Sequence, residues 1–301
     1  MERHAPSRSG YDLRDSAAHL AGAYDEDVLE VHAALRLYRR AVPTVDVNGA
    51  RLWYDNAGSG ETVLLLHGGL GDSGLWEPVA PLLAERFRTI RTDLRFFGRS
   101  TGPLAPWSWQ DDVVGVLDAL DVERAALVGL SMGGKLALDV ALAHPERLWA
   151  VAGVAPGLGG HSAGAYSEEQ DARYEAADAA GDLEAAMEID LEVWAPLGAD
   201  ERMRQLWHAT PEAAELPSDL EPLAPAGAPA KERLAELAVP TLVVTVSKDP
   251  AGMREIGPLV AREAPDARHL ELDSDHYVTL REPELVSRVL LEFLAAAAPQ
   301  Q

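Results

Sequence analysis

The chain has 301 residues, no cysteine and a formal net charge of −23 at pH 7. Its length allows one large α/β core with an insertion, while the missing cysteines exclude disulfides, thiolate metal sites and cysteine nucleophiles. The negative charge argues against nucleic acid and membrane surfaces as partners. No apolar run reaches the roughly 18 residues that span a bilayer, and the first residues do not resemble a signal peptide, so we expect a cytoplasmic protein.

Residues 1–41 are expected to form a helical extension. Apolar residues recur there at steps of three and four, at Leu20, Tyr24, Val28, Val31, Leu35 and Tyr38. This spacing predicts one or two amphipathic helices. Six apolar residues on one stripe are too many to leave in water, so we expect the stripe to pack on the core or on a second copy, as a homodimer.

Strands and helices alternate after residue 42. A hairpin with its turn at Asn48-Gly49 comes first, followed by a short apolar strand ending in glycines. The elements expected next are helix 76–87, strand 88–93, helix 108–120, strand 125–131, helix 133–145, strand 148–156, strand 240–246, helix 253–264, strand 268–272 and helix 283–297. Such alternation predicts a mostly parallel, doubly wound sheet.

Residues 157–238 interrupt this alternation. They are expected to be helical and polar, and between His161 and Glu236 they carry 18 Asp or Glu against 5 Lys or Arg, a net charge of −13. A solvated helical surface explains this charge. The alternative is a lid whose field disfavours anionic substrates. We therefore divide the chain into an extension (1–41), a core (42–156 and 239–298) and a helical insertion (157–238).

Ser131 stands between Gly129 and Gly133, directly after a buried strand and before a helix. A tight strand-to-helix turn exposes a nucleophile above the sheet by holding it in a strained backbone, and side chains two residues away on either side would collide. The following helix points its first N–H groups at the same place, where they stabilise negative charge. The alternative explanation is a plain small-residue crossing between strand and helix.

A serine nucleophile needs a base held by an acid, in the chain order serine, acid, histidine. His276 lies in a loop between the last strand and the last helix, whereas His208 lies in the insertion and His269 begins a strand. Asp249 ends a strand and is the expected acid. Asp273 and Asp275 are the competitors, but they share the short loop of His276 and reach behind its ring with difficulty.

Two backbone N–H groups are expected to stabilise the oxyanion, those of Met132 and of Gly69 in the "HGG" turn. His67 is then a structural residue that shapes this turn. A competing motif overlaps it: Gly69 to Gly74 match G-x-G-x-x-G, and Asp93 follows at the end of the next strand. That pattern is typical of a dinucleotide-binding oxidoreductase.

Five stretches, "LLLHGGLGDSGLW", "DLRFFGRS", "GLSMGG", "VPTLVVTVSKD" and "DHYVTLREPE", occur in the order found in the α/β-hydrolase superfamily. Over residues 42–298 the chain resembles its serine branch, and most closely the enol-lactonases and esterases. The resemblance implies an α/β-hydrolase fold with a cap at residues 157–238, a Ser131–Asp249–His276 triad and no cofactor. Phe96, Val246 and Asp275 depart from the glycines common in the family.

These observations predict a cofactor-independent hydrolase of a neutral or apolar ester or lactone. The same triad supports C–C bond hydrolysis, perhydrolysis or a lyase step in natural-product tailoring, and a binding protein without catalysis is a further alternative. The candidates for the substrate pocket are five aromatic residues: Trp76, Phe97, Trp194, Trp207 and Tyr277. Simple core packing explains each of them equally well.

Overall fold

The computed structural model describes residues 43–211 and 222–299. The apolar stripe predicted between residues 16 and 40, with its packing and dimer roles, lies outside the described residues and stays a prediction. Within the described part, one sheet holds eight strands: β1 (Thr44–Val47), β2 (Ala50–Ala57), β3 (Thr62–Leu66), β4 (Arg88–Thr92), β5 (Ala125–Leu130), β6 (Leu148–Val154), β7 (Thr241–Val246) and β8 (Ala267–Leu272).

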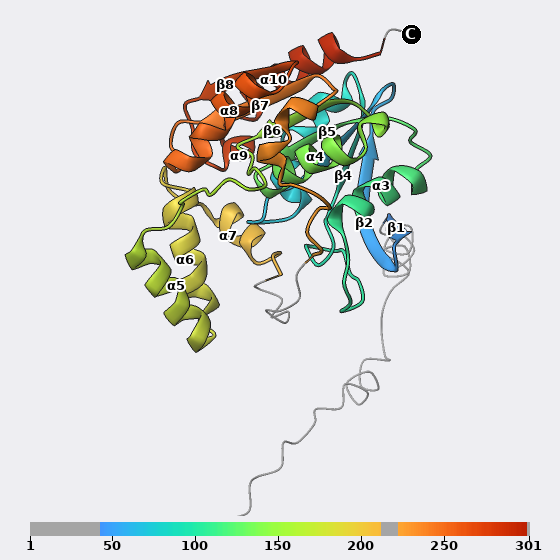
Figure 1. Cartoon of the computed structure of the whole chain (residues 1–301). Coiled ribbons are helices and arrows are strands. Elements are labelled where there is room, and N and C mark those ends of the chain that lie inside the picture. Colours follow the sequence, from blue (N-terminus) through green and yellow to red (C-terminus); the bar gives the residue numbers. More distant parts are fainter. Residues whose placement is uncertain (1–42, 212–221, 300–301) are drawn as a thin grey trace, which may run out of the picture. The chain divides into compact units, whose positions relative to one another are not determined.

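The strand order is β1-β2-β4-β3-β5-β6-β7-β8, and all pairs from β4 to β8 are parallel. Only the first hairpin is antiparallel to its neighbours within this described sheet (Figure 1). Its turn residues Asn48 and Gly49 have φ of 49° and 79°, the left-handed pair that a two-residue hairpin turn requires. The doubly wound, mostly parallel sheet predicted from the sequence is confirmed.

Helices cover both faces of the sheet, because the strand residues that point toward each face are apolar. Val63 and Leu65 join a core cluster with helices α2 (Ala80–Ala84) and α10 (Pro283–Ala297). Leu64 and Leu66 face the opposite cluster, with α3 (Trp109–Ala119), α4 (Met132–Ala143) and α8 (Ala251–Glu263). These four side chains of β3 are fully buried, as expected for a central parallel strand.

The predicted helix 76–87 is wrong as a single element. A 3₁₀ turn, η2 (Ser73–Trp76), is followed by the short helix α2, which begins only at Ala80. Pro78 lies between the two and has no N–H to donate, so the hydrogen bonds of a continuous helix cannot run through it. A further short helix that the pattern did not predict, α9 (Val278–Arg281), follows the histidine loop.

Between β6 and β7 the chain leaves the sheet to form α5 (Glu168–Ala180), α6 (Leu183–Trp194) and α7 (Glu201–Trp207). Ser167 and Gln170 form a reciprocal capping box at the start of α5, and Gly181 ends it in the left-handed conformation. All three helices lie within residues 157–238, the segment that we propose as a cap. In Figure 1 they extend below the carboxyl edge of the sheet. Two 3₁₀ turns, η4 (Ala230–Glu232) and η5 (Leu234–Glu236), precede β7.

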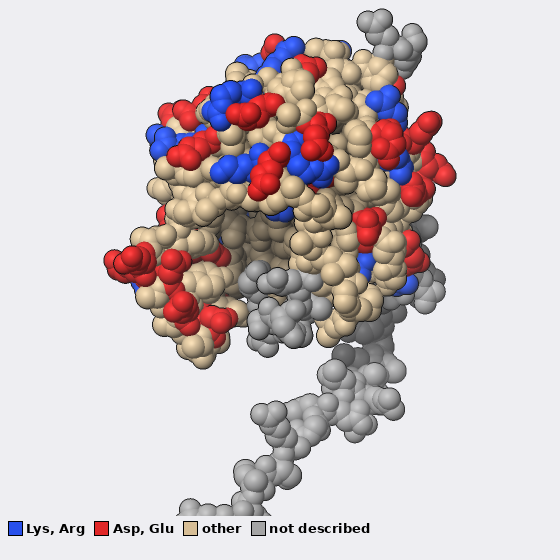
Figure 2. Space-filling model, in the orientation of Figure 1, with Lys and Arg blue, Asp and Glu red and all other residues tan. Residues whose placement is uncertain are grey.

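Acidic side chains gather on the outer surface around α5 and α6, and the face between these helices and the core is hollowed (Figure 2). None of the helices in residues 43–211 and 222–299 combines the length and the apolar character that crossing a membrane requires.

Candidate active site

Ser131 occupies a sharp turn between β5 and α4, with φ 54° and ψ −115°. A non-glycine residue reaches this region only where its surroundings impose it. The two flanking glycines are steric requirements. A Cβ on Gly129 would lie 2.1 Å from the Gly133 carbonyl oxygen, and one on Gly133 would lie 2.4 Å from the Leu66 carbonyl oxygen. The turn therefore has the geometry of a nucleophile elbow, as its glycine spacing predicted.

His276 and Asp249 meet at the carboxyl edge of the sheet. The Nδ1–H of His276 donates to the Asp249 carboxylate, at 2.9 Å from Oδ2 and 3.1 Å from Oδ1. Both side chains are almost entirely buried. Because the carboxylate accepts only from a protonated nitrogen, we assign the proton to Nδ1, which leaves Nε2 free to act as a base. Asp249 follows β7 and His276 follows β8, so the sheet fixes both positions.

The competing acids have other partners. Asp273 accepts from the Ser247 hydroxyl at 2.5 Å and pairs with the Lys248 ammonium at 3.0 Å, on the exposed side of the loop. Asp275 is fully buried and accepts from the Arg281 Nε–H at 2.6 Å and from the Leu197 backbone N–H at 3.2 Å. Since Leu197 belongs to the insertion, Asp275 joins that segment to the histidine loop.

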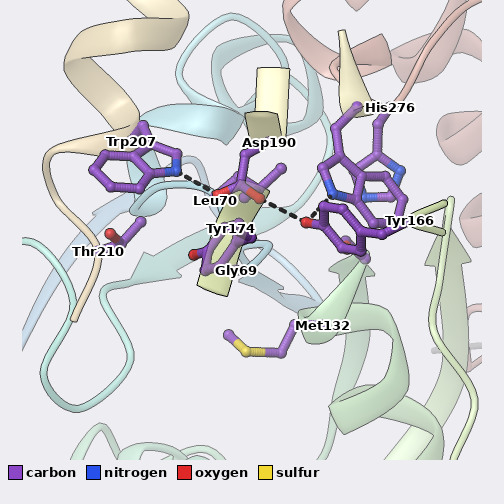
Figure 3. Close-up of a pocket in the computed structure, with 11 residues that line it drawn as sticks. Gly69, Leu70, Met132, Tyr166, Tyr174, Asp190, Trp207, Thr210 and His276 are labelled. Carbon is purple, nitrogen blue, oxygen red and sulfur yellow. Dashed lines mark hydrogen bonds between the residues drawn. The ribbon is translucent and has the colours of Figure 1, made fainter. Parts of the chain in front are cut away.

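A cavity of about 260 Å³ opens between this edge of the sheet and helices α5 to α7 (Figure 3). We call it the Ser131 cavity, and its lining residues are Gly69, Leu70, Ser131, Met132, Tyr166, Tyr174, Asp190, Trp194, Trp207, Thr210 and His276. The predicted nucleophile, base and both oxyanion residues thus line one space. Gly69 lies beside the Met132 side chain, because a Cβ on Gly69 would lie 3.8 Å from the Met132 sulfur and 4.0 Å from its Cβ.

His67 is placed as a structural residue. Its Nε2 accepts from the Leu94 backbone N–H at 2.9 Å, and its Nδ1–H donates to the Gly68 carbonyl at 2.8 Å. Complete burial lowers the pKa of this imidazole, against the opposing charge of Asp93. His269 bonds the Thr245 hydroxyl at 2.8 Å on the sheet, and His208 ends α7 beside Glu184. None of these three histidines lines the Ser131 cavity.

The dinucleotide motif does not have the required local structure. The stretch Gly69–Gly74 ends inside the four-residue η2 turn, whereas the fingerprint needs a full helix whose N-terminus faces the pyrophosphate. Asp93, the expected ribose-binding acid, is fully buried, and its carboxylate accepts from the Ser73 N–H and from Arg99. Burial alone would raise the pKa of Asp93. The hydrogen bond from Arg99, the electrostatic interaction with His67 and the hydrogen bond from Ser73 together hold this pKa below its usual value.

Of the five aromatic pocket candidates, Trp194 and Trp207 line the Ser131 cavity. Trp76 instead lies in the core and donates to the Leu66 carbonyl at 2.9 Å. Phe97 packs edge-on against His67, and Tyr277 is buried away from the lining.

The cavity is also lined from the insertion by Tyr166, Tyr174 and Asp190, which were not among the residues predicted from the sequence. Asp190 carried a readable signal, because it lies on the apolar stripe of α6 formed by Met187, Leu191 and Trp194. An acid at such a position is buried and needs partners.

No cluster of three or more His, Cys, Asp or Glu side chains suited to a metal ion occurs among the described residues. The side chains that converge at the cavity are suited to acid–base and nucleophilic chemistry: a hydroxyl on a strained turn, an imidazole and a carboxylate behind it.

The family model described as "alpha/beta hydrolase fold" matches residues 61–208. The 2-hydroxymuconate semialdehyde hydrolase of Pseudomonas sp. (strain CF600) is 41% identical over 107 residues, 33% of this chain and 38% of that protein. The 2-hydroxy-6-oxo-6-phenylhexa-2,4-dienoate hydrolase of Comamonas testosteroni is 36% identical over 122 residues, 37% of this chain and 42% of that protein. The matches thus span about two fifths of the length of these curated relatives.

Similarity to solved structures extends much further along the chain. The enol-lactonase from Burkholderia xenovorans LB400 superposes with a TM-score of 0.68 at 25% identity, covering 84% of this chain and 100% of that one. This coverage exceeds the share of the chain that lies outside residues 157–238, so the superposition includes at least part of the insertion. The observed sheet order, the turn at Ser131 and these similarities agree, and the chain belongs to the α/β-hydrolase superfamily.

Proposed function

We propose that this protein is a cofactor-independent serine hydrolase that cleaves a carboxylic ester or lactone. The observation that carries the proposal is the buried contact between His276 Nδ1 and Asp249, in an imidazole that lines the same cavity as Ser131. This arrangement matches the requirements of a nucleophile, a base and an orienting acid. The enol-lactonase similarity favours acyl chemistry.

In the proposed mechanism, His276 Nε2 takes the Ser131 hydroxyl proton as the serine oxygen attacks the carbonyl carbon. Asp249 keeps the proton on Nδ1 and stabilises the imidazolium that forms. The N–H groups of Gly69 and Met132 donate to the developing oxyanion. The imidazolium then protonates the leaving alcohol, and a water molecule activated by His276 releases the acid from Ser131.

A second candidate is hydrolysis of a carbon–carbon bond by the same residues. The curated relative from Comamonas testosteroni is named as a hydrolase of 2-hydroxy-6-oxo-6-phenylhexa-2,4-dienoate, a compound without an ester group. Its alignment covers less than half of either chain. Solved meta-cleavage product hydrolases match this chain over as much of its length as the enol-lactonase does, but at lower identity, 21% and 22% against 25%.

A substrate panel separates the two. It contains neutral 4-nitrophenyl esters of two to six carbons, five- and six-membered lactones and a vinylogous 1,5-diketone, each tested with and without EDTA. We expect turnover of an ester or lactone that EDTA leaves unchanged and that Ser131→Ala and His276→Ala abolish. Cleavage of the diketone alone would favour the second candidate, and full ester turnover by Ser131→Ala would refute the assigned site.

A further inference from the structure

A buried carboxylate faces the Ser131 cavity from the insertion. Asp190, on α6, is 4% exposed. The Tyr166 hydroxyl donates to its Oδ1 at 2.5 Å, and the Trp207 Nε1–H donates to its Oδ2 at 2.7 Å, as Figure 3 shows. The Trp194 Nε1–H in turn donates to the Tyr166 oxygen at 2.9 Å. This chain of hydrogen bonds fixes the carboxylate in one orientation at the cavity wall.

The network also reaches the predicted base. The Trp194 ring lies 4.4 Å from the His276 ring, centroid to centroid, so Asp190 is separated from the reacting groups by Tyr166 and one indole. The pKa of the Tyr166 hydroxyl is raised far above its ordinary value, first by burial and then by the negative charge of Asp190.

The remaining lining residues of the cavity offer a substrate carboxylate no cationic side chain to pair with. Among the described residues that line the cavity there is one carboxylate and no lysine or arginine. The other polar groups are hydroxyls, indoles and the His276 imidazole, and the imidazole is already held by Asp249. A substrate carboxylate entering this space would lose water and gain a like charge, which costs several kcal/mol in a desolvated site.

We propose that Asp190 is a specificity-determining residue that restricts this cavity to substrates without a carboxylate group. The inference rests on the proposed hydrolase function and narrows its substrate class to uncharged esters or lactones. It separates this chain from the relative of Comamonas testosteroni, whose named substrate is a dienoate, a carboxylate anion. In this proposal the one buried charge of Asp190 selects against anionic substrates, and not the summed charge of the acidic insertion surface.

Two matched pairs of esters test this proposal. One pair carries the charge on the acyl part, as 4-nitrophenyl hydrogen glutarate and its methyl ester. The other carries it on the alcohol part, as 4-carboxyphenyl acetate and its methyl ester. For the native enzyme we expect kcat/KM to be about 100-fold higher for the neutral member of at least one pair, the size of effect that like charges in a dry site produce.

Asp190→Asn should reduce that preference at least about ten-fold, because the amide keeps hydrogen-bonding capacity and loses the charge. The preference is the ratio of two kcat/KM values measured on the same enzyme preparation, so a smaller fraction of active protein in the variant does not change it. The matched control is Glu192→Gln, which removes one charge from the same helix at a half-exposed position paired with Arg173. We expect it to change the preference by less than about two-fold.

Equal kcat/KM for both members of both pairs would overturn the proposal while leaving the hydrolase function intact. An effect of Glu192→Gln as large as that of Asp190→Asn, or a preference that disappears in about 1 M salt, would also overturn it in favour of the surface field, which salt screens. If no ester is turned over, the proposed function fails. Calorimetric titration of the same pairs onto Ser131→Ala then decides the charge selection by itself.

Discussion

The two walls of the Ser131 cavity are built differently. On the core wall, Ser131 directly follows β5, while Asp249 and His276 lie in the short loops after β7 and β8. A strained backbone fixes Ser131, and a buried hydrogen-bonded pair fixes the other two. On the cap wall, Asp190 and its donors lie on helices and loops that are held by side-chain contacts. The contrast assigns chemistry to the core wall and selection to the cap wall, because only the sheet offers fixed backbone positions for a reacting constellation.

Replacing the nucleophile tests the core wall most severely. Ser131→Ala should lower kcat by about six orders of magnitude, roughly 8 kcal/mol, as removal of a triad nucleophile does elsewhere. Its free energy of unfolding should stay within about 1 kcal/mol of the native value, since the turn is imposed by its surroundings. Stopped assays over hours and chemical denaturation measure the two quantities. A variant that keeps a tenth of its turnover would contradict the assignment.

The acid can be separated from its neighbours by three substitutions. Asp249→Asn should cost about 10⁴-fold in kcat, because the amide favours the wrong tautomer of His276. Asp273→Asn is the matched control in the adjacent loop. Since Asp273 pairs only outward with Ser247 and Lys248, kcat should fall less than about two-fold. If Asp273→Asn loses its turnover while Asp249→Asn keeps it, Asp249 is not the acid that orients His276.

The core wall also depends on Asp93, which holds the two loops that follow β3 and β4. Asp93→Asn should lower the free energy of unfolding by about 2 kcal/mol at pH 7, because the buried site keeps its donors and loses the charge that Arg99 compensates. The folded state lowers the pKa of Asp93, so its stabilising contribution exists above the unfolded pKa and is lost as pH falls through the folded one. Urea titrations should therefore show native and variant curves converging below about pH 4; a gap that stays constant with pH would contradict this.

Apart from the Asp273→Asn control, the smallest effect should come from the contact that joins the insertion to the histidine loop. Asp275 bonds Leu197 of the insertion and Arg281 of α9, beside His276. Asp275→Asn should lower kcat/KM about ten-fold, mainly through KM, because the insertion loses its fixed distance from the histidine loop while the triad stays. Steady-state kinetics on one neutral ester separate kcat from KM. If the whole loss in kcat/KM came from kcat, with KM unchanged, Asp275 would act on His276 and not on the position of the insertion.

The sequence predicted the core wall better than the cap wall, for a physical reason. Gly129 and Gly133 are required by contacts of 2.1 and 2.4 Å that any side chain would make, so the motif and the geometry are nearly the same information. Asp249 was predicted as the acid because Asp273 and Asp275 share the short loop of His276 and reach behind its ring with difficulty. In the structure the Asp249 carboxylate accepts from His276 Nδ1.

The cap wall depends on packing between helices that no short motif specifies. Tyr166, Asp190 and Trp207 meet only when three separate segments of the insertion assemble. Three of the five aromatic candidates, Trp76, Phe97 and Tyr277, lie outside the lining because large rings are as useful in a core as in a pocket.

Labelling with a neutral fluorophosphonate, read by peptide mass spectrometry, tests whether Ser131 is the nucleophile and His276 its base. We expect one covalent adduct on the peptide that contains Ser131, no adduct in Ser131→Ala, and labelling at least about 100-fold slower in His276→Ala, because the hydroxyl then lacks its base. An adduct on another residue would show that Ser131 is not the nucleophile, and unchanged labelling in His276→Ala would show that His276 is not its base.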